Sequence, residues 1–473
     1  MSTADQPVPA PSAPPPTAPR RRRHRWLDAF YPAIWRWHFW AGLLVAPVLV
    51  VVSLTGALFV FHEEINELIQ PGLRRVAPGG ARLPCEARLA AARAHLGDGW
   101  RLAFISESDD PARADELLFE KEKHHDPAAQ SGENGDGHDH EYMTVMVNPH
   151  TANVTGSASS KTGFTGVVLR LHRTLLAGAP GRIIVELATC WGIVTLLTGL
   201  LLWWPRLKGK IRGVWLPRFR RGGGTALRDL HVVPAIYTLP LALIIMFTGL
   251  LFTPVWGRGF FAGLYLAGQL PAGYISPPKS APAPEGARLL TADEAIAAAR
   301  RHFDFGRISV RVPARPGDAW LIASPLDELF KPGAFVSIDA CSGAALDVVQ
   351  FRDLPLGARL ARWFYPVHTG AIFGLPTKIL AVAACLAIIL MSVTGVMMWW
   401  RRRPPGKSGA PRKPPGSPPA ATPASESVPE AVPKAIVCVI VFLGVVFPLV
   451  GASLLLLLAG QLIVRRVRRK STR

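Results

Sequence analysis

Two stretches of the chain share one pattern, and this repeat decides the fold. Residues 171–204 read LHRTLLAGAPGRIIVELATCWGIVTLLTGLLLWW, and residues 367–400 read VHTGAIFGLPTKILAVAACLAIILMSVTGVMMWW. In each stretch a histidine, His172 or His368, precedes a Thr-Gly pair by 26 residues and the second of two tryptophans by 32. The apolar run between them has about the 20 residues that cross the hydrocarbon core of a membrane. The pattern therefore predicts one type of spanning helix, present twice.

A second repeated motif precedes the first in both halves of the chain. His38 precedes Thr55-Gly56 by 17 residues, and His231 precedes Thr248-Gly249 by the same 17. We interpret the Thr-Gly pairs as small-residue contacts that let helices pack closely. Because both halves run in the same direction, we expect a pseudo-two-fold axis along the membrane normal.

Composition and charge support an integral membrane protein. Of the 473 residues, 49% are hydrophobic and only 18% are charged, which is less charge than in typical soluble proteins. The net charge of +20 comes from basic clusters at 20–25, 206–228 and 401–403, where apolar runs begin or end. This is the positive-inside pattern, so the lipid bilayer and not nucleic acid is the expected partner. We expect a multi-pass protein of the bacterial inner (cytoplasmic) membrane with a cytoplasmic N-terminus.

The predicted fold is an α-helical integral membrane protein with two tandem helix–soluble domain–helix halves, pseudo-two-fold symmetry and a C-terminal apolar helix. The expected segments are a disordered cytoplasmic N-terminus (1–35), spanning helices (36–62, 182–204, 231–254, 372–400), small α+β outer domains (63–181, 255–371), a basic cytoplasmic loop (205–230), a cytoplasmic Pro-rich linker (401–433), a last apolar run (434–464) and a basic tail (465–473). The last run fits a tilted or kinked single helix, which we favour, or a re-entrant hairpin.

The four repeated histidines are the main candidates for a functional site. A lone histidine at a helix end is usually an interfacial polar residue. Two-fold symmetry, however, would make His38 face His231 near the cytoplasm and His172 face His368 near the outside. Two facing imidazoles in a helical bundle are the ligand set of a six-coordinate b-type haem, whereas zinc or copper would need further ligands that the motifs lack. We predict two bis-histidine haems, with no side chain in a catalytic role.

Other polar residues have both functional and structural interpretations. His62 is an alternative outer ligand, a residue that faces substrate, or a polar cap beside its acidic neighbours. Arg173, together with Arg182 and Lys378, could pair with haem propionates or extend to the membrane interface. Glu186 is a functional candidate by its depth in the membrane, or a partner of Arg182 four residues earlier.

An insert at 121–141 in the first outer domain is rich in histidine and acidic residues. Its histidines, which are His124, His125, His138 and His140, could bind a transition metal loosely. The structural alternative is a solvated loop. Five cysteines, none in a CxxC arrangement, exclude a zinc ribbon and covalently attached haem.

These motifs resemble one known family. The stretches 37–42, 53–56, 171–175, 186–189, 197–206, 367–370 and 399–400 are similar to those of the PepSY-associated transmembrane family, over residues from about 36 to 402. The family includes iron-regulated membrane proteins and ferric-siderophore reductases. The resemblance implies that the outer domains are PepSY-like and that two haems pass electrons across the inner membrane to ferric siderophores in the periplasm.

The expected function is therefore haem-dependent reduction of a ferric siderophore or related metal chelate. A quinol or a cytoplasmic-side donor would supply the electrons, and reduction would release iron because Fe(II) is held poorly by hard oxygen ligands. A different class of function is a non-enzymatic PepSY-type regulator or sensor of a periplasmic partner, which would need no paired histidines. A third class is a metal or siderophore transporter, in which polar residues or broken helices near mid-membrane are more typical.

Overall fold

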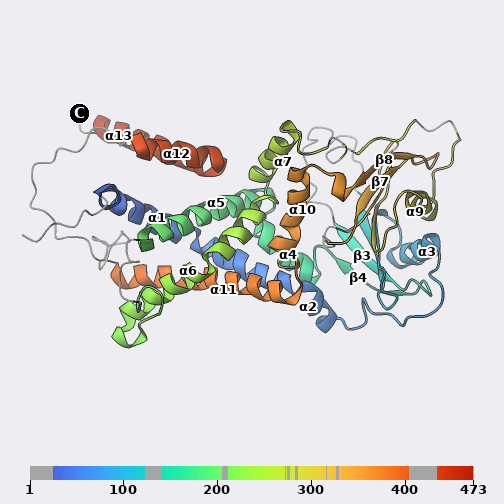
Figure 1. Cartoon of the computed structure of the whole chain (residues 1–473), viewed down its shortest axis with the longest axis horizontal. Coiled ribbons are helices and arrows are strands. Elements are labelled where there is room, and N and C mark those ends of the chain that lie inside the picture. The colour runs from blue at the N-terminus through green and yellow to red at the C-terminus, as the bar shows by residue number, and fades with distance from the viewer. Residues whose placement is uncertain are drawn as a thin grey trace, which may run out of the picture.

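The protein has a helical bundle at one end and a sheet domain at the other (Figure 1). The computed structural model describes residues 25–122, 141–204, 211–271, 273, 277–282, 286–315, 317–325, 330–403 and 434–471. Most of the expected disordered N-terminus, of the His-rich insert and of the Pro-rich linker lies outside these residues, so the predictions for those parts stay untested. Residues 25–35, which were expected to be disordered, are part of the first helix.

Four long helices form the bundle: α1 (Arg25–Val60), α5 (Gly178–Trp203), α6 (Gly223–Leu250) and α11 (Leu375–Arg402). Among the described residues, these four are long and apolar enough to cross a membrane. They pack in a ring in which α1 touches α5 and α11, and α6 touches the same two helices. Small side chains such as Ala188 and Ala242 fill the interior, while large apolar side chains such as Leu44 and Leu386 remain exposed on the outside, as expected for a surface that faces lipid.

The two outer segments form one sheet and not two separate domains. The sheet has the order β4-β3-β2-β1-β5-β6-β7-β8, with antiparallel neighbours throughout. Its strands are β1 (Trp100–Glu107), β2 (Asp115–Lys121), β3 (Tyr142–Val147), β4 (Val154–Ser159), β5 (Ile308–Arg311), β6 (Trp320–Ala323), β7 (Ala334–Ile338) and β8 (Ala345–Gln350). At the centre β1 pairs with β5, with Ile105 opposite Val310. Each outer segment thus supplies one helix and four strands to this domain, and ladder hydrogen bonds between β1 and β5 join the two units into one sheet, which the sequence did not predict.

One face of the sheet packs against α3 (Cys85–Leu96) and α9 (Ala292–Arg300), which lie side by side (Figure 1). Alternate strand residues, such as Ile105 and Ile322, are fully buried under these helices. The helices also cap each other. The Asp293 carboxylate accepts the backbone N–H of Cys85 at 2.8 Å, and Glu86 accepts that of Ala292 at 3.3 Å.

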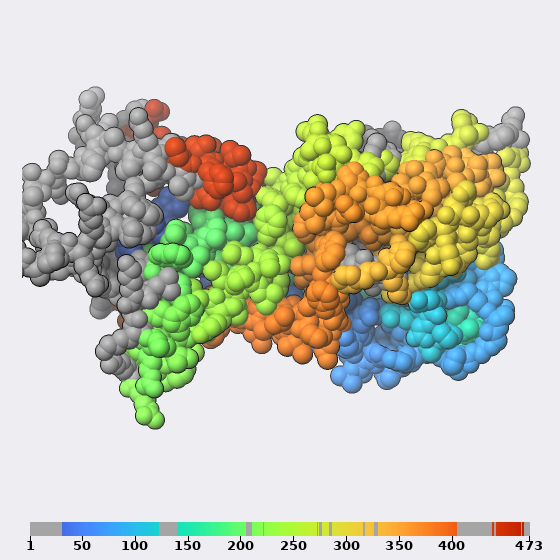
Figure 2. Space-filling view, viewed as in Figure 1, coloured from blue at the N-terminus to red at the C-terminus, as the bar shows by residue number. Residues whose placement is uncertain are grey.

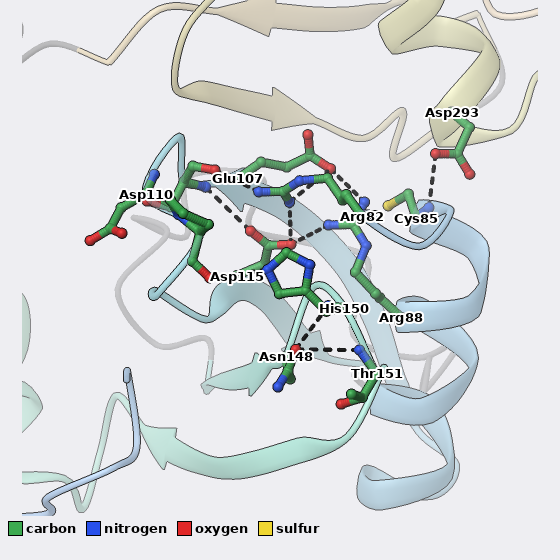
Figure 3. A network of polar contacts seen from close by, with 12 residues as sticks. Arg82, Cys85, Arg88, Glu107, Asp110, Asp115, Asn148, His150, Thr151 and Asp293 are labelled. Carbon is green, nitrogen blue, oxygen red and sulfur yellow. Dashed lines mark hydrogen bonds and ion pairs between the residues drawn. The ribbon is translucent and has the colours of Figure 1, made fainter. Parts of the chain in front are cut away.

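A buried charge network ties α3 to the first half of the sheet (Figure 3). Arg88 donates to Asp115 and, at 2.6 Å, to Glu107, while Arg82 donates to Asp115 at 2.5 Å. Removing one member would leave a buried charge without its partner, at a cost of about 3–5 kcal/mol. Burial beside this network raises the pKa of the Cys85 thiol to about 12, so this free cysteine is an unreactive core residue.

Four shorter helices lie at the junction of bundle and sheet domain: α2 (His62–Ile69), α4 (Phe164–Thr174), α7 (Trp256–Leu266) and α10 (Leu356–His368). Glu186 of α5 is fully buried, and its carboxylate accepts the backbone N–H groups of Val255 and Trp256 at 2.9 and 2.8 Å. It thus caps the start of α7. This capping role is one that neither sequence interpretation of Glu186 named.

The last apolar run forms two helices, α12 (Lys434–Val446) and α13 (Pro448–Ser471). A Cβ on Gly451 would lie 2.8 Å from the Cα of Gly444, so the chain folds back on itself. Helix α13 packs on α5 (Figure 2). In this contact Trp191 donates to Ser453 at 3.1 Å. This is the geometry of the hairpin alternative and not of the single helix that we favoured.

Candidate functional site

The structure brings the four repeated histidines together as two pairs. His38 of α1 and His231 of α6 lie with ring centroids 6.3 Å apart and ring planes nearly perpendicular. His172 of α4 and His368 of α10 lie 6.2 Å apart, with an angle of 51° between the rings. We call the first the distal pair, because it lies in the bundle half remote from the sheet, and the second the sheet-side pair.

All four imidazoles are held in the same way, by Nδ1 against a backbone carbonyl and a threonine hydroxyl of a neighbouring helix. Nδ1 lies 2.9–3.0 Å from the carbonyl oxygen and 3.1–3.4 Å from the hydroxyl oxygen in each case. The carbonyl and hydroxyl partners, in that order, are Thr195 and Thr198 for His38, Met391 and Thr394 for His231, Val52 and Thr55 for His172, and Ile245 and Thr248 for His368. Because a carbonyl only accepts, Nδ1 carries the proton and Nε2 keeps its lone pair for a ligand.

A glycine beside each imidazole makes room for the ring. A Cβ would lie 3.1 Å from Cε1 of His38 at Gly199, 3.1 Å from His172 at Gly56, 2.8 Å from His368 at Gly249 and 3.4 Å from His231 at Gly395. The Thr-Gly pairs that we interpreted as helix-packing contacts are therefore histidine seats: the threonine orients the ring and the glycine admits it. The fixed spacing between the histidines and the Thr-Gly pairs is the sequence feature that indicates this role. The spacing does not indicate which Thr-Gly pair contacts which histidine.

Each pair opens into a cavity within the bundle. The distal cavity, of about 240 Å³, is lined by both histidines together with Trp203, Trp399, Arg228 and Arg402. Both tryptophan Nε1 atoms are buried and have no hydrogen-bond partner among the described residues. The sheet-side cavity, of about 380 Å³, is lined by its histidines together with Arg173, Arg182 and Tyr365. Each cavity thus combines apolar walls with two arginines.

Two other predicted candidates are not part of these sites. His62 stacks on Phe59, with ring centroids 4.4 Å apart, and its Nδ1 lies 2.7 Å from the Phe59 carbonyl. It lines neither cavity, so the structure does not bring it to either histidine pair. Lys378 donates to Glu64 at 2.6 Å and ties α11 to α2.

The geometry limits the chemistry. Among the described residues, no group of three or more His, Cys, Asp or Glu side chains could hold a metal ion. Each pair instead offers two imidazole rings, with centroids 6.3 Å apart in one pair and 6.2 Å apart in the other. A metal–imidazole bond of about 2 Å on each side, plus the radius of each ring, predicts about 6 Å between centroids. The pairs therefore fit a metal whose remaining ligands come from a cofactor.

Fold and site together define an integral membrane protein with two histidine pairs in a helical bundle that adjoins a sheet domain. The chain belongs to the family of the PepSY-associated TM region, which it matches over residues 35–402. Comparison with curated proteins gives no match.

Proposed function

We propose that the protein holds two b-type haems, one at each histidine pair, and transfers electrons to an Fe(III) siderophore or a related chelate. The single observation that carries this proposal is the geometry of the two pairs, with Nδ1 held by the protein, Nε2 left for a ligand, and centroids 6.2 and 6.3 Å apart. In this proposal two tandem halves, related by a pseudo-two-fold axis, each supply one ligand to each haem.

The residues around the distal pair fit the carboxylates of such a cofactor. Trp203 and Trp399 each present a buried indole N–H that needs an acceptor, and Arg228 and Arg402 line the same cavity. A propionate would accept from both kinds of donor. Arg173 and Arg182 would do the same at the sheet-side pair.

The chain's own residues orient the ligands and exclude water. The carbonyl and hydroxyl seats fix each imidazole as the Nδ1–H tautomer, and the apolar cavity walls keep the dielectric low. The bound haems would supply one-electron exchange between donor and acceptor. Oxidation of one quinol to quinone releases two protons and two electrons, and these reduce two Fe(III) chelates to Fe(II), which oxygen chelators hold more weakly.

The proposed location is the bacterial inner membrane, with the N-terminus and the basic loop 205–230 in the cytoplasm and the sheet domain in the periplasm. The distribution of basic residues supports this orientation. It places the distal pair near a cytoplasmic-side or quinol donor and the sheet-side pair near the acceptor.

Haem quantification in histidine variants tests the proposal. We expect His38→Ala and His231→Ala to remove or convert the same haem, and His172→Ala and His368→Ala the other. Double variants within a pair should resemble the singles, because one lost imidazole already leaves the iron five-coordinate. His62→Ala is the control and should keep both haems. A purified protein without a Soret band, or depletion of different haems by His38→Ala and His231→Ala, would contradict the proposal. The absence of haem would favour the regulator.

A further inference from the structure

A third cavity lies between the sheet and helix α10, outside both histidine sites. Its volume is about 530 Å³, within the range of small-molecule sites. It opens on the sheet face opposite to α3 and α9, because alternate residues of β5, such as Ile308 and Val310, are buried under those helices. The intervening Ser309 and Arg311 line the cavity instead.

Three arginines converge on this cavity. Arg307, just before β5, and Arg311, at its end, lie an even number of residues from Ser309 and so on the same face of the sheet. Arg362 comes from α10. Arg362 is buried, and its guanidinium carbon lies 3.3 Å from the centroid of the Phe351 ring. This stacking holds the planar group in one orientation, as in sites that bind carboxylates with two hydrogen bonds.

The rest of the lining is neutral. Leu321, Ala323 and Phe335 form an apolar floor, and the described lining residues include no acidic side chain. Of the acidic residues nearby, Glu107 pairs with Arg88, and the Asp347 carboxylate lies next to Gly273. Asp327 and Glu328 lie outside the described residues. Arginines on an apolar floor favour an anionic ligand with some apolar surface, and they disfavour a cation.

Tyr365 connects this cavity to the sheet-side histidines, because it lines both cavities. It contacts Phe252 with ring centroids 6.2 Å apart, and Phe252 contacts His368 at 5.7 Å. The rings of Tyr365 and Phe252 would therefore lie between a ligand in the third cavity and the His368 imidazole. Such a separation suits electron transfer without direct coordination to the histidine.

We propose that this cavity is the acceptor site and that it selects Fe(III) chelates of net negative charge, in which carboxylates hold the iron. This proposal rests on the proposed function, since the electron comes from the sheet-side pair. One electron reduces the bound Fe(III) to Fe(II). The carboxylates then hold the ion less tightly, and Fe(II) leaves. Arg307, Arg311 and Arg362 are binding residues for the ligand carboxylates.

Binding of redox-inert gallium chelates to the full-length protein in detergent tests the site without any electron transfer. We expect Ga(III)-citrate, an anionic complex, to bind in calorimetry, with a dissociation constant that rises about tenfold or more in Arg311→Gln and in Arg307→Gln, because each loses a charge-assisted hydrogen bond. Arg301→Gln removes an exposed arginine at the end of α9, behind the opposite sheet face, and should leave affinity unchanged. The cationic Ga(III)-desferrioxamine B should bind at least tenfold more weakly.

Each alternative result overturns a defined claim. Equal affinities in wild type, Arg307→Gln and Arg311→Gln would exclude the cavity. Citrate alone binding as tightly as its gallium complex would make it an organic-anion site and not a chelate site. Haem spectra recorded on the same samples separate this proposal from the proposed function. Intact haem signals with arginine-independent binding would contradict only the acceptor site. Arginine-dependent binding to a protein without haem would contradict the electron-transfer function, and the cavity would then be a chelate-binding site without an acceptor role.

Discussion

The four glycines beside the histidine rings leave unequal room for a side chain. A Cβ at Gly249 would lie 2.8 Å from Cε1 of His368, closer than side chains normally approach, whereas at Gly395 it would lie 3.4 Å from Cε1 of His231. Each of the two glycines lies within a long helix and follows a threonine. Alanine at Gly249 must therefore displace an imidazole, and alanine at Gly395 needs little adjustment.

This difference gives a matched pair of variants. We expect Gly249→Ala to lower bound haem by about half, since only the sheet-side haem would lose its ligand geometry. Gly395→Ala should keep both haems. The pyridine haemochrome assay measures the haem content, and protein recovery controls for folding. Equal haem loss in the two variants would show that the glycines do not act as histidine seats.

Asp339, at the end of β7, stabilises a turn of the sheet domain through its charge. Its carboxylate accepts the backbone N–H groups of Ser342, Cys341 and Ala281, and the Ser342 hydroxyl at 2.8 Å. These hydrogen bonds, of which the one from the Ser342 backbone N–H has the largest effect, lower the pKa of Asp339 to about 2 from its ordinary value of about 3.9. A lowered pKa means that this stabilisation is complete above pH 4 and is lost as pH falls towards 2.

We therefore expect Asp339→Asn to destabilise the protein at pH 7 by about 1–2 kcal/mol. The difference from wild type should shrink between pH 4 and pH 2, where the native carboxylate becomes protonated as well. Thermal unfolding of the solubilised chain, followed by circular dichroism across this pH range, checks the prediction. Asp304→Asn, at an exposed position, is the control. A constant difference at all pH values would exclude the charge as the cause.

At the scale of elements, local sequence patterns predict individual helices and strands, but they do not predict which distant segments pair with each other. In the sequence, apolar residues alternate at 308–312, 320–323 and 335–339, a pattern that predicts strands, and β5, β6 and β7 occupy nearly those ranges. The sequence Thr-x-x-Glu at 291–294 predicts the start of a helix, and Thr291 and Glu294 form this capping box at the start of α9. The pairing of Ile105 with Val310 could not be predicted, because no local pattern records the register between segments two hundred residues apart.

The C-terminal helices give a topological prediction. Because α12 and α13 fold back at Gly444 and Gly451, the basic C-terminal end of α13 should lie on the same side of the membrane as the loop before α6. We expect Arg466→Cys and Arg212→Cys to resist an impermeant maleimide in intact cells and to react after permeabilisation. Cys341 and Cys438 should be replaced by serine first. Labelling of only one of the two positions in intact cells would indicate a single crossing.

At the scale of the whole molecule, one sheet positions both sheet-side ligands. The edge strand β4 ends at Ser159, and α4, which carries His172, begins at Phe164. The other edge strand, β8, leads through a short 3-10 turn into α10, which carries His368. The two outer segments, which supply β1–β4 and β5–β8, pack together as one sheet domain (Figure 2). The distal histidines lie on α1 and α6, and their seats lie on α5 and α11.

This arrangement predicts that damage to the sheet affects one histidine pair and spares the other. Val336 of β7 is fully buried, and its cross-strand partner Val348 of β8 is 38% exposed. Val336→Asp places a carboxylate in the core, at a cost of several kcal/mol, whereas Val348→Asp places the same carboxylate at the solvent-exposed edge. We expect Val336→Asp to lose the sheet-side haem while the bundle keeps the distal haem, and Val348→Asp to keep both. Redox difference spectra and haem quantification of the two variants distinguish these outcomes. Loss of both haems in Val336→Asp would mean that the bundle cannot assemble without the sheet, which would contradict the independence of the distal pair.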